Sequence, residues 1–363
     1  MATLKKQFNS IADVVNLFES CNLTELGIMA DEKRQELHPD SEPVTFVIDR
    51  NVNYTNICSC KCKFCMFNRD KDAPDAYVLT YEEIKPKLDE LVAAGGTQLL
   101  MQGGMNDDLP LEYYINLIKS IKKDFPTLAI HSFSPPEIDF IAKNNGLSAK
   151  ELLEELIRNG LSSIPGGGAE LLSDEIRSKL SPNKIPSARW LEIMETAHNL
   201  GIRTTATMVF GFGEEPRHIA EHLLKIKALQ EKTGGFTAFI PWTFAPGSTP
   251  HPDINHLFPQ REKGNLNNTA HDYLKTLAIS RLVLDNIPNI QVSWVTQGLT
   301  TAQVGLRFGA NDFGGVMLEE NVVRAAGVCN RTNADEIAEY IRKAGFTPAQ
   351  RDTYYRILKK IAT

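Results

Sequence analysis

Short apolar segments alternate along the chain with longer segments in which apolar residues recur every three or four positions. The first apolar segment is 44–49, and the first helical pattern opens at Thr80, with Glu83 three residues on as in a capping box. Further strands are expected at 98–102, 128–131, 161–165, 204–210, 236–241, 291–294 and 308–312. Helices are expected between them, most clearly from Ser148 onward and over 187–200, 216–230 and 269–284.

Eight strands with helices between them predict parallel βα units. The expected fold class is therefore α/β, a (β/α)8 TIM-type barrel, with a doubly wound open sheet as the alternative. Residues 1–43 are interpreted as an N-terminal helical extension and residues 44–331 as the barrel. Residues 332–363 are expected to form two further helices, broken at Gly345 and Pro348 and packed on the barrel. A long loop is expected over 241–268, which is rich in Pro, Gly, Asn and His.

The composition limits the partners and the cellular compartment that can be expected for such a barrel. Hydrophobic residues make up 42% and charged residues 23% of the 363 residues, as is typical of a folded, soluble protein. The net charge of −6, without a basic block, argues against nucleic acid as a partner. No apolar run approaches the ~18 residues of a membrane span, and the first residues form no apolar signal core. We therefore expect a cytoplasmic protein without a membrane partner.

Four of the six cysteines lie between positions 58 and 65. In a reducing compartment such a group indicates metal binding before it indicates disulfides. The spacing Cys58-x3-Cys62-x2-Cys65 allows three thiolates on one loop to bind three irons of a [4Fe–4S] cubane, which leaves the fourth iron open for a substrate. Ferredoxins use four cysteines, so this loop favours chemistry over simple electron transfer. Cys60 is interpreted as a spare thiol.

Two other readings of the cysteine group remain open. In a zinc knot, Cys60 would be the fourth ligand, but it lies too close in sequence to Cys58 and Cys62 for the usual paired spacing. A non-catalytic iron–sulfur electron carrier would need a complete set of four ligands.

The cysteine spacing, with Phe64 before the last cysteine, resembles the motif of the radical S-adenosylmethionine (SAM) superfamily. An electron carrier, by contrast, would not bind SAM. Other segments resemble its menaquinone and deazaflavin branch, and most closely the cyclic dehypoxanthinylfutalosine synthases, over about residues 40 to 350. Met66 departs from the pattern, in which a small alanine is usual. The segments that carry the resemblance are 53–58, 100–104, 131–138, 164–170, 203–208, 234–242, 293–298 and 309–315.

The resemblance implies a [4Fe–4S] cluster on Cys58, Cys62 and Cys65, with SAM as co-substrate. A 5′-deoxyadenosyl radical would remove the ribose C4′ hydrogen of dehypoxanthine futalosine, and the carbon radical would close a ring onto the substrate's benzoate ring. The pathway would be the futalosine route to menaquinone, with an external one-electron donor of flavodoxin or ferredoxin type. Aminofutalosine synthase and the tyrosine-using subunit of deazaflavin (FO) synthase are the nearest alternatives.

Several residues are candidates for holding the cofactors. Gln102, Gly103 and Gly104 close the second strand, where glycines allow a ligand close to the backbone, although strand-end glycines are usually turns. The resemblance suggests that Glu170 contacts SAM. Ser134 could hydrogen-bond SAM or substrate, and it is equally expected to be the N-cap residue of a helix. Phe64 and Phe67 flank the last cysteine and complete the candidate cofactor site.

The acid–base and substrate-binding candidates are polar residues near strand ends or on the helix before the seventh strand. We expect His131 and Asp312 to point into the barrel mouth, where either could accept the proton lost when an aromatic ring is restored. Asp285 is a further catalytic candidate. Arg281 could bind a substrate carboxylate through its two-pronged guanidinium, with a structural ion pair as the alternative.

Overall fold

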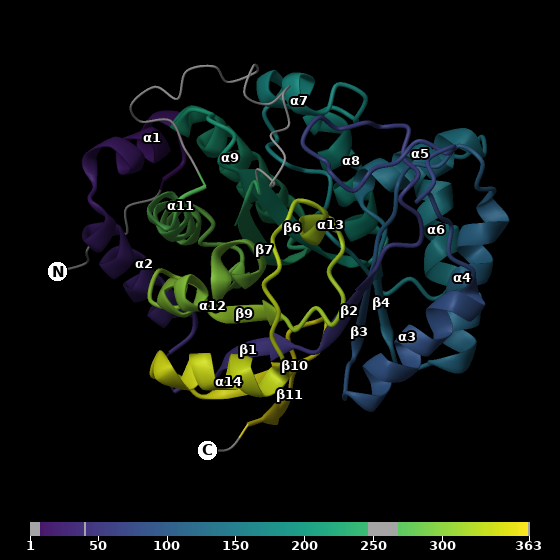
Figure 1. Cartoon of the computed structure of the whole chain (residues 1–363). Helices are drawn as coiled ribbons and strands as arrows, with labels where there is room; N and C mark the ends of the chain where they lie inside the picture. The colour runs from purple at the N-terminus through teal and green to yellow at the C-terminus, as the bar shows by residue number, and fades with distance from the viewer. Residues whose placement is uncertain (1–7, 40, 246–267, 362–363) are drawn as a thin grey trace.

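The computed structural model describes residues 8–39, 41–245 and 268–361, and its strands form two connected sheets (Figure 1). The seven-stranded sheet is parallel and runs in chain order from β2 to β8, and the four-stranded sheet has the order β11-β10-β1-β9. The strands are β1 (Val44–Val47), β2 (Asp49–Val52), β3 (Gln98–Met101), β4 (Ala129–Ser132), β5 (Ser163–Ile164), β6 (Arg203–Phe210), β7 (Phe236–Thr243), β8 (Asn289–Ile290), β9 (Asp312–Gly315), β10 (Pro348–Arg351) and β11 (Ile357–Lys360).

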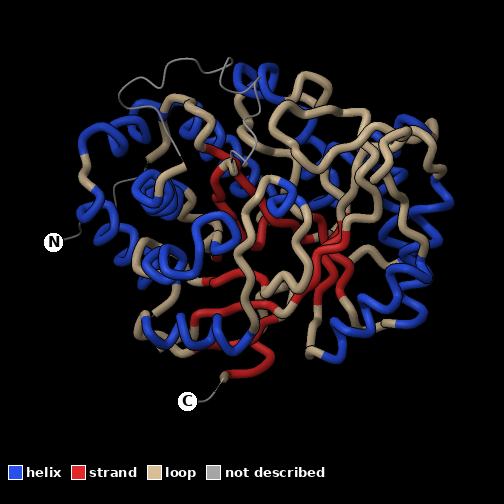
Figure 2. Tube along the Cα trace, viewed as in Figure 1, coloured by secondary structure: helices blue, strands red, loops and turns tan. Residues whose placement is uncertain are grey.

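Helices lie on the outside of the barrel strands, and the last strand, β11, lies at the edge of the molecule beside the C-terminus (Figure 2). The helices are α1 (Ile11–Ser20), α2 (Leu23–Leu37), α3 (Tyr81–Ala93), α4 (Leu111–Asp124), α5 (Pro135–Asn144), α6 (Ala149–Asn159), α7 (Asp174–Leu180), α8 (Ser187–Asn199), α9 (Pro216–Thr233), α11 (Ala270–Val283), α12 (Trp294–Gly305), α13 (Val322–Ala325) and α14 (Ala334–Lys343).

The two sheets close into one barrel at β9. β1 and β2 are consecutive strands separated only at Ile48, and β9 pairs in parallel with β1 through Thr45 and Asp312. On its other side, the N–H of Val292, next to β8, donates to the carbonyl of Asp312 at 3.0 Å. β9 therefore lies between β8 and β1. The expected (β/α)8 TIM-type barrel is confirmed.

The helices cover the barrel with apolar faces that match their sequence patterns. α6 begins after Ser148, whose hydroxyl accepts the N–H of Glu151, and it buries Leu152, Leu153 and Leu156. The N-terminal helices α1 and α2 pack on α9 and α11 and form the expected helical extension outside the barrel.

The C-terminal segment differs from the expectation of two helices. α14 ends before Gly345, which has a φ of 85°. The chain then enters β10, where Pro348 pairs in parallel with Val44 of β1, and β11 returns antiparallel to β10. The prediction of a second helix is wrong. The backbone of this segment forms its hydrogen bonds with β1, which lies about three hundred positions earlier in the chain. A strand pairing over such a distance cannot be recognised from the local sequence.

The last two barrel strands are also displaced from their expected positions. β8 ends at Ile290, and Trp294 already opens α12. β9 starts at Asp312, whereas Phe308 lies in the turn before it. The sequence analysis had assigned no particular residues to helices α4, α7, α12 and α13. Most of the expected loop 241–268 lies outside the described residues, and β7 continues into its first part as far as Thr243.

Candidate active site

The cysteines lie on a loop that follows β2 and is fixed by main-chain contacts. The N–H of Cys58 donates to the carbonyl of Arg69 at 3.1 Å, and Thr55 forms an isolated bridge with Val78. The guanidinium of Arg69 donates to the carbonyls of Met66 and Asn68 inside the loop. The loop is therefore held in shape by the protein itself.

All four thiols of this loop line a cavity of about 390 Å³. Cys60 and Cys62 are buried, and their sulfurs lie 3.6 Å apart. The hydrogen bond with Cys60 lowers the pKa of the Cys62 thiol to about 6, and nearby Lys184 acts in the same direction against the effect of burial. A thiolate is the form that binds metal.

The donor set fits a cluster rather than a single metal ion. Among the described residues, no group of three or more His, Cys, Asp or Glu side chains is placed to hold one ion. Three thiols that line one cavity suit a group in which each thiolate binds a different iron. Cys58, Cys62 and Cys65 would hold that group, and the cavity below gives room for its co-substrate.

The walls of the cavity come from alternate residues of the strands, as the pleat requires. In β2 and just after it, Asp49, Asn51 and Asn53 line the cavity, whereas Arg50 points outward to Glu90. The other strands or their ends supply the following lining residues: Gln98, Leu100, Gln102, His131, Pro165, Thr205, Thr207, Val209, Ile240, Trp242, Gln291, Gly315, Met317 and Arg351.

The segment Gln102-Gly103-Gly104 lines the cavity, but its glycines are required by the protein itself. A Cβ on Gly103 would lie 2.5 Å from the ring of Tyr54, and one on Gly104 would lie 2.1 Å from the carbonyl oxygen of Ile57. Their N–H groups are also occupied, since Gly103 donates to Glu137 and Gly104 to the carbonyl of Thr55. These N–H groups are therefore not free donors for a ligand.

Glu137 is a cavity residue that the sequence analysis missed. Its buried carboxylate accepts hydrogen bonds from the Tyr54 hydroxyl at 2.7 Å, the Gly103 N–H at 2.9 Å and both the N–H and the hydroxyl of Ser134. Burial raises the pKa of Glu137, and the hydrogen bonds oppose that rise. Ser134 stands at the N-cap position of α5, where its N–H and hydroxyl both donate to Glu137. The Ser-x-x-Glu spacing was the signal that could have identified Glu137.

Glu170 lines the cavity in a left-handed backbone conformation, with a φ of 39°. Its carboxylate accepts a 2.6 Å hydrogen bond from Lys184, another residue that sequence reasoning missed. The Lys184 ammonium also lies 5.4 Å from the centre of the Phe64 ring. Burial lowers the pKa of Lys184, but Cys62 and Glu170 outweigh it and raise that pKa above the usual lysine value. This pair lies directly beside the cysteine loop.

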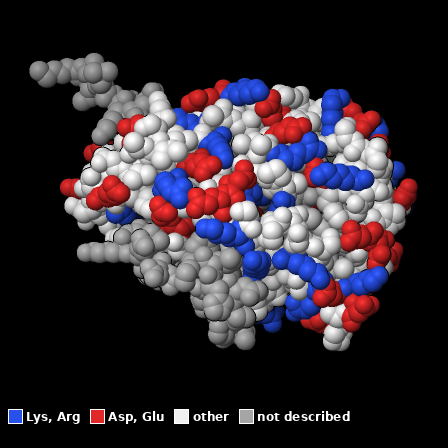
Figure 3. Space-filling view, turned by 90° about the horizontal axis from the view of Figure 1, so that it is seen from above, with Lys and Arg blue, Asp and Glu red and all other residues white. Residues whose placement is uncertain are grey.

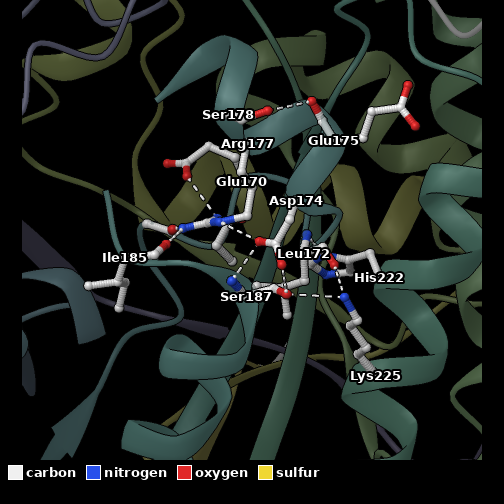
Figure 4. Close-up of polar contacts among 12 residues, drawn as sticks. Glu170, Leu172, Asp174, Glu175, Arg177, Ser178, Ile185, Ser187, His222 and Lys225 are labelled. Carbon is white, nitrogen blue, oxygen red and sulfur yellow. Dashed lines mark hydrogen bonds and ion pairs between the residues drawn. The ribbon is translucent and has the colours of Figure 1, made fainter. Parts of the chain in front are cut away.

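Arg177 fixes the position of the segment that carries Glu170 by hydrogen bonding to it. Its guanidinium donates to the carbonyls of Gly168 and Ala169 and to that of Ile185 at 2.6 Å, and it lies 3.4 Å from the Glu170 carboxylate. Figure 4 shows Arg177 lying between Glu170 and Ile185. The buried guanidinium therefore joins the two stretches of chain that present Glu170 and Lys184.

Of the acid–base candidates, His131 lies in the cavity. Its Nδ1 is 2.9 Å from the hydroxyl of Ser163, which itself donates to the carbonyl of Arg203. Because that hydroxyl proton is already used, Nδ1 must carry the hydrogen, which leaves Nε2 as an acceptor. Burial, with Arg351 nearby, lowers the pKa of His131 to about 3. The ring is therefore neutral.

Asp312 does not point into the barrel mouth, and the expectation that it does is wrong. Its carboxylate forms a two-pronged ion pair with Arg351, at 2.6 and 2.9 Å, and accepts the hydroxyl of Thr45 at 2.5 Å and the N–H of Gly314 at 3.0 Å. These four bonds occupy both oxygens. Asp312 therefore joins β9 to β1 and β10.

Arg281 and Asp285 also lie away from the cavity. Arg281 is fully buried and donates to the carbonyls of Gly309, Ile287 and Pro288 and to the Asn311 amide, so it binds the protein's own backbone rather than a substrate carboxylate. The ion-pair alternative is also wrong, because its partners are uncharged. Asp285 forms an ion pair with Lys227 of α9 on the outside of the barrel. The structure thus corrects both assignments.

A barrel whose mouth carries a loop with three such thiols is the architecture of a radical SAM enzyme. The family model described as "Radical SAM superfamily" matches residues 52–226, and the one described as "CofH/MqnC C-terminal region" matches residues 233–362. The chain belongs to the CofH/MqnC family of radical SAM enzymes. Members of this superfamily use a [4Fe–4S] cluster and SAM, and so does this protein.

The curated relatives cover nearly the whole chain. A cyclic dehypoxanthine futalosine synthase of Halalkalibacterium halodurans is 45% identical over 96% of this chain and 91% of the relative. One of Streptomyces coelicolor is 42% identical over 95% and 84%. A 5-amino-6-(D-ribitylamino)uracil–L-tyrosine 4-hydroxyphenyl transferase of Methanococcus aeolicus is 42% identical over 87% of each chain.

Two solved structures share the fold. Methylornithine synthase (PylB) has a TM-score of 0.71 with 19% identity and covers 95% of each chain. The FeFe-hydrogenase maturase HydG of Carboxydothermus hydrogenoformans has a TM-score of 0.72 with 17% identity over 97% of this chain and 78% of the maturase. In the described parts of the chain, no helix is both long and apolar enough to cross a membrane.

Proposed function

We propose that this protein converts dehypoxanthine futalosine to its cyclic form, a step on the futalosine route to menaquinone. The observation that carries the proposal is the 45% and 42% identity, over almost the whole chain, to two curated synthases of that product. The cavity supports it, because a single barrel interior connects the cysteine loop to a polar floor around Asp49, Gln98 and Arg351.

In this proposal Cys58, Cys62 and Cys65 hold the cluster, and SAM occupies the adjoining part of the cavity. When bound, the two groups supply a 5′-deoxyadenosyl radical that removes a hydrogen atom from the substrate. Glu170 and Lys184 present a carboxylate and an ammonium that suit the ribose and methionine portions of SAM. Gln102 and Ser134 supply further polar contacts, and Phe64 and Phe67 shield the loop.

The remaining cavity suits a substrate that combines a sugar with an aromatic ring. Side-chain amides and hydroxyls, such as Asn51, Thr205 and Thr207, can bind ribose hydroxyls, while Leu100 and Trp242 offer apolar contact to a ring. His131 offers an acceptor at Nε2 for a substrate hydroxyl.

The reaction needs an external one-electron donor, which we propose to be a small flavodoxin- or ferredoxin-type protein. Cys58 and Cys65 are only half-buried, so the loop lies near the surface. On the face shown in Figure 3, Lys and Arg side chains lie interspersed with Asp and Glu. We propose that the donor is recognised by contacts around the cysteine loop. We also propose that the reaction takes place in the cytoplasm, where reducing conditions keep thiols available for a cluster.

Anaerobic reconstitution with dehypoxanthine futalosine deuterated at C4′ tests the proposal. The expected result is singly deuterated 5′-deoxyadenosine in about one-to-one yield with the cyclic product. Parallel reactions contain either tyrosine with 5-amino-6-(D-ribitylamino)uracil or the enol-ether substrate of aminofutalosine synthase. Turnover with a rival substrate alone would overturn the proposal, and so would deuterium in solvent but not in 5′-deoxyadenosine. Release of no 5′-deoxyadenosine would instead indicate an electron carrier.

A further inference from the structure

Asp49 is a buried carboxylate inside the barrel, and the cluster and SAM assignments above do not use it. It lines the cavity from the first position of β2, opposite Gln98 of β3. One oxygen accepts the N–H of Met317 at 2.8 Å. Among the described residues, no side chain donates to either oxygen. The carboxylate therefore keeps acceptor capacity at a wall of the cavity.

The barrel closure holds this carboxylate in place. Asp49 packs against Gly315 at the end of β9, where an added Cβ would lie 2.3 and 2.4 Å from its two oxygens. The carbonyl of Gly315 in turn accepts the indole N–H of Trp294 at 2.9 Å. A glycine is thus required for the carboxylate to occupy its position, and the group is fixed by packing on one side and a hydrogen bond on the other.

The other carboxylates that line the cavity are already engaged. Glu137 accepts four hydrogen bonds, Glu170 is paired with Lys184, and Glu320 accepts the N–H groups at the start of α13. His131 is neutral, and its pKa near 3 makes it a weak proton acceptor at neutral pH. By contrast, burial raises the pKa of Asp49 to about 6, against the lowering effects of Met317 and Arg351.

Resting on the proposed function, we propose that Asp49 is the proton acceptor of the cyclisation. The bond from C4′ to a ring carbon leaves that carbon with both a hydrogen and the new substituent. Restoring the aromatic ring breaks this C–H bond. Its electron pair returns to the ring, the proton passes to the Asp49 carboxylate, and the unpaired electron leaves to a one-electron acceptor of iron–sulfur type. Asp49 replaces Asp312 in this role.

The assignment also agrees with the electrostatics of the cavity floor. The Arg351 guanidinium and the Asp312 carboxylate are the charged groups that act most strongly on Asp49, and they form a neutral pair with each other. Arg351 lies over the Tyr355 ring, at 3.8 Å from its centre, and cannot turn toward Asp49 without leaving Asp312. Asp49 thus faces the cavity without a counter-ion in contact.

The variant Asp49→Asn tests the proposal, because asparagine keeps the shape and the oxygen that accepts the Met317 N–H. Loss of a general base costs about 10²- to 10⁴-fold in the step it assists. We expect cyclic product to fall about 100-fold or more, while deuterium still passes from C4′ to 5′-deoxyadenosine. The ratio of 5′-deoxyadenosine to product should rise from about one to well above ten.

A second readout separates proton transfer from binding. Equilibrium binding of dehypoxanthine futalosine to the reconstituted protein, with SAM but without reductant, should change less than about threefold in Asp49→Asn. One-to-one product at the wild-type rate in this variant would overturn the proposal, as would loss of binding equal to the loss of product. Uncoupling in His131→Gln but not in Asp49→Asn would assign the proton to His131 instead. Absence of cyclic product from the wild type would refute the proposed function.

Discussion

Gly104 lies against the main chain of Ile57, the residue that precedes Cys58. The space between them is so small that a Cβ on Gly104 would lie 2.1 Å from the Ile57 carbonyl oxygen and 2.8 Å from the Cys58 Cβ. The end of β3 and the cysteine loop therefore meet without an intervening side chain. This contact couples a glycine of the cavity wall to the position of Cys58, the first of the proposed cluster ligands.

Gly104→Ala should therefore impair cluster binding rather than SAM binding alone. The added methyl group must displace Ile57 and Cys58, because backbone atoms rather than a flexible side chain occupy the space. We expect bound iron to fall by about tenfold after reconstitution, with an unchanged far-ultraviolet circular dichroism spectrum. Gly146→Asn is the control, since Gly146 has a φ of 66° and open space around it, and asparagine tolerates that conformation. Full iron content with normal SAM cleavage in Gly104→Ala would contradict this reading.

Replacement of each cysteine of the loop by alanine should separate ligands from the spare thiol. We expect Cys58→Ala, Cys62→Ala and Cys65→Ala each to lose the cluster, because a cubane held at two irons is unstable. Cys60→Ala should retain it, although Cys60 lies 3.6 Å from Cys62. Iron content and SAM cleavage after anaerobic reconstitution provide the measurement. A cluster that survives in Cys58→Ala but not in Cys60→Ala would show that the ligand assignment is wrong.

Three aspartates show which features of the fold and of the site could be predicted from the sequence and which could not. The alternation of short apolar runs with helical patterns predicted the barrel, since repeated βα units form a parallel sheet. The partner of Asp312, Arg351, lies in a C-terminal strand that sequence had suggested to be helical. Asp49 was counted as the end of an apolar run, and Asp285 as a catalytic candidate. Which of them lines the cavity depends on strand register and barrel closure, which are set by contacts between distant segments.

Asp312→Asn should destabilise the protein far more than Asp285→Asn. Asp312 is fully buried and pairs with Arg351, so its loss leaves a buried guanidinium without its counter-charge, at a cost of about 3–5 kcal/mol. Asp285 is partly exposed, and its partner Lys227 also donates to the Asn9 side chain, so a smaller loss is expected when Asp285 becomes neutral. Chemical denaturation of both variants measures the difference. Equal and small effects would contradict the structural role of the Asp312–Arg351 pair.

The last prediction concerns acid stability and His222 of α9. The His222 ring is fully buried, and its Nδ1 accepts the N–H of Leu172 at 3.0 Å. Burial, together with Arg177 and Lys225, lowers its pKa to about 3, so the folded protein keeps the ring neutral while the unfolded chain takes up a proton below about pH 6.5. The stability that this neutral ring contributes is therefore complete above about pH 6.5 and is lost progressively as the pH falls toward 3.

At pH 5 the loss should be about 2 kcal/mol relative to pH 7.5, since each pKa unit corresponds to about 1.4 kcal/mol. His222→Asn removes this titration. This variant should be less stable than the wild type at pH 7.5, because the buried ring and its hydrogen bond are altered. The stability gap, which is the difference in unfolding free energy between wild type and variant, should narrow by about 2 kcal/mol at pH 5. Asp49 and Glu214, whose pKa values burial raises to about 6 and 7, act in the opposite direction in both proteins and cancel in this comparison.

Ile219→Val, a buried change in the same helix without a titrating group, should show a stability gap that does not vary with pH. Urea denaturation at the two pH values measures both gaps, and a constant gap for His222→Asn would show that the ring is not held neutral by its surroundings.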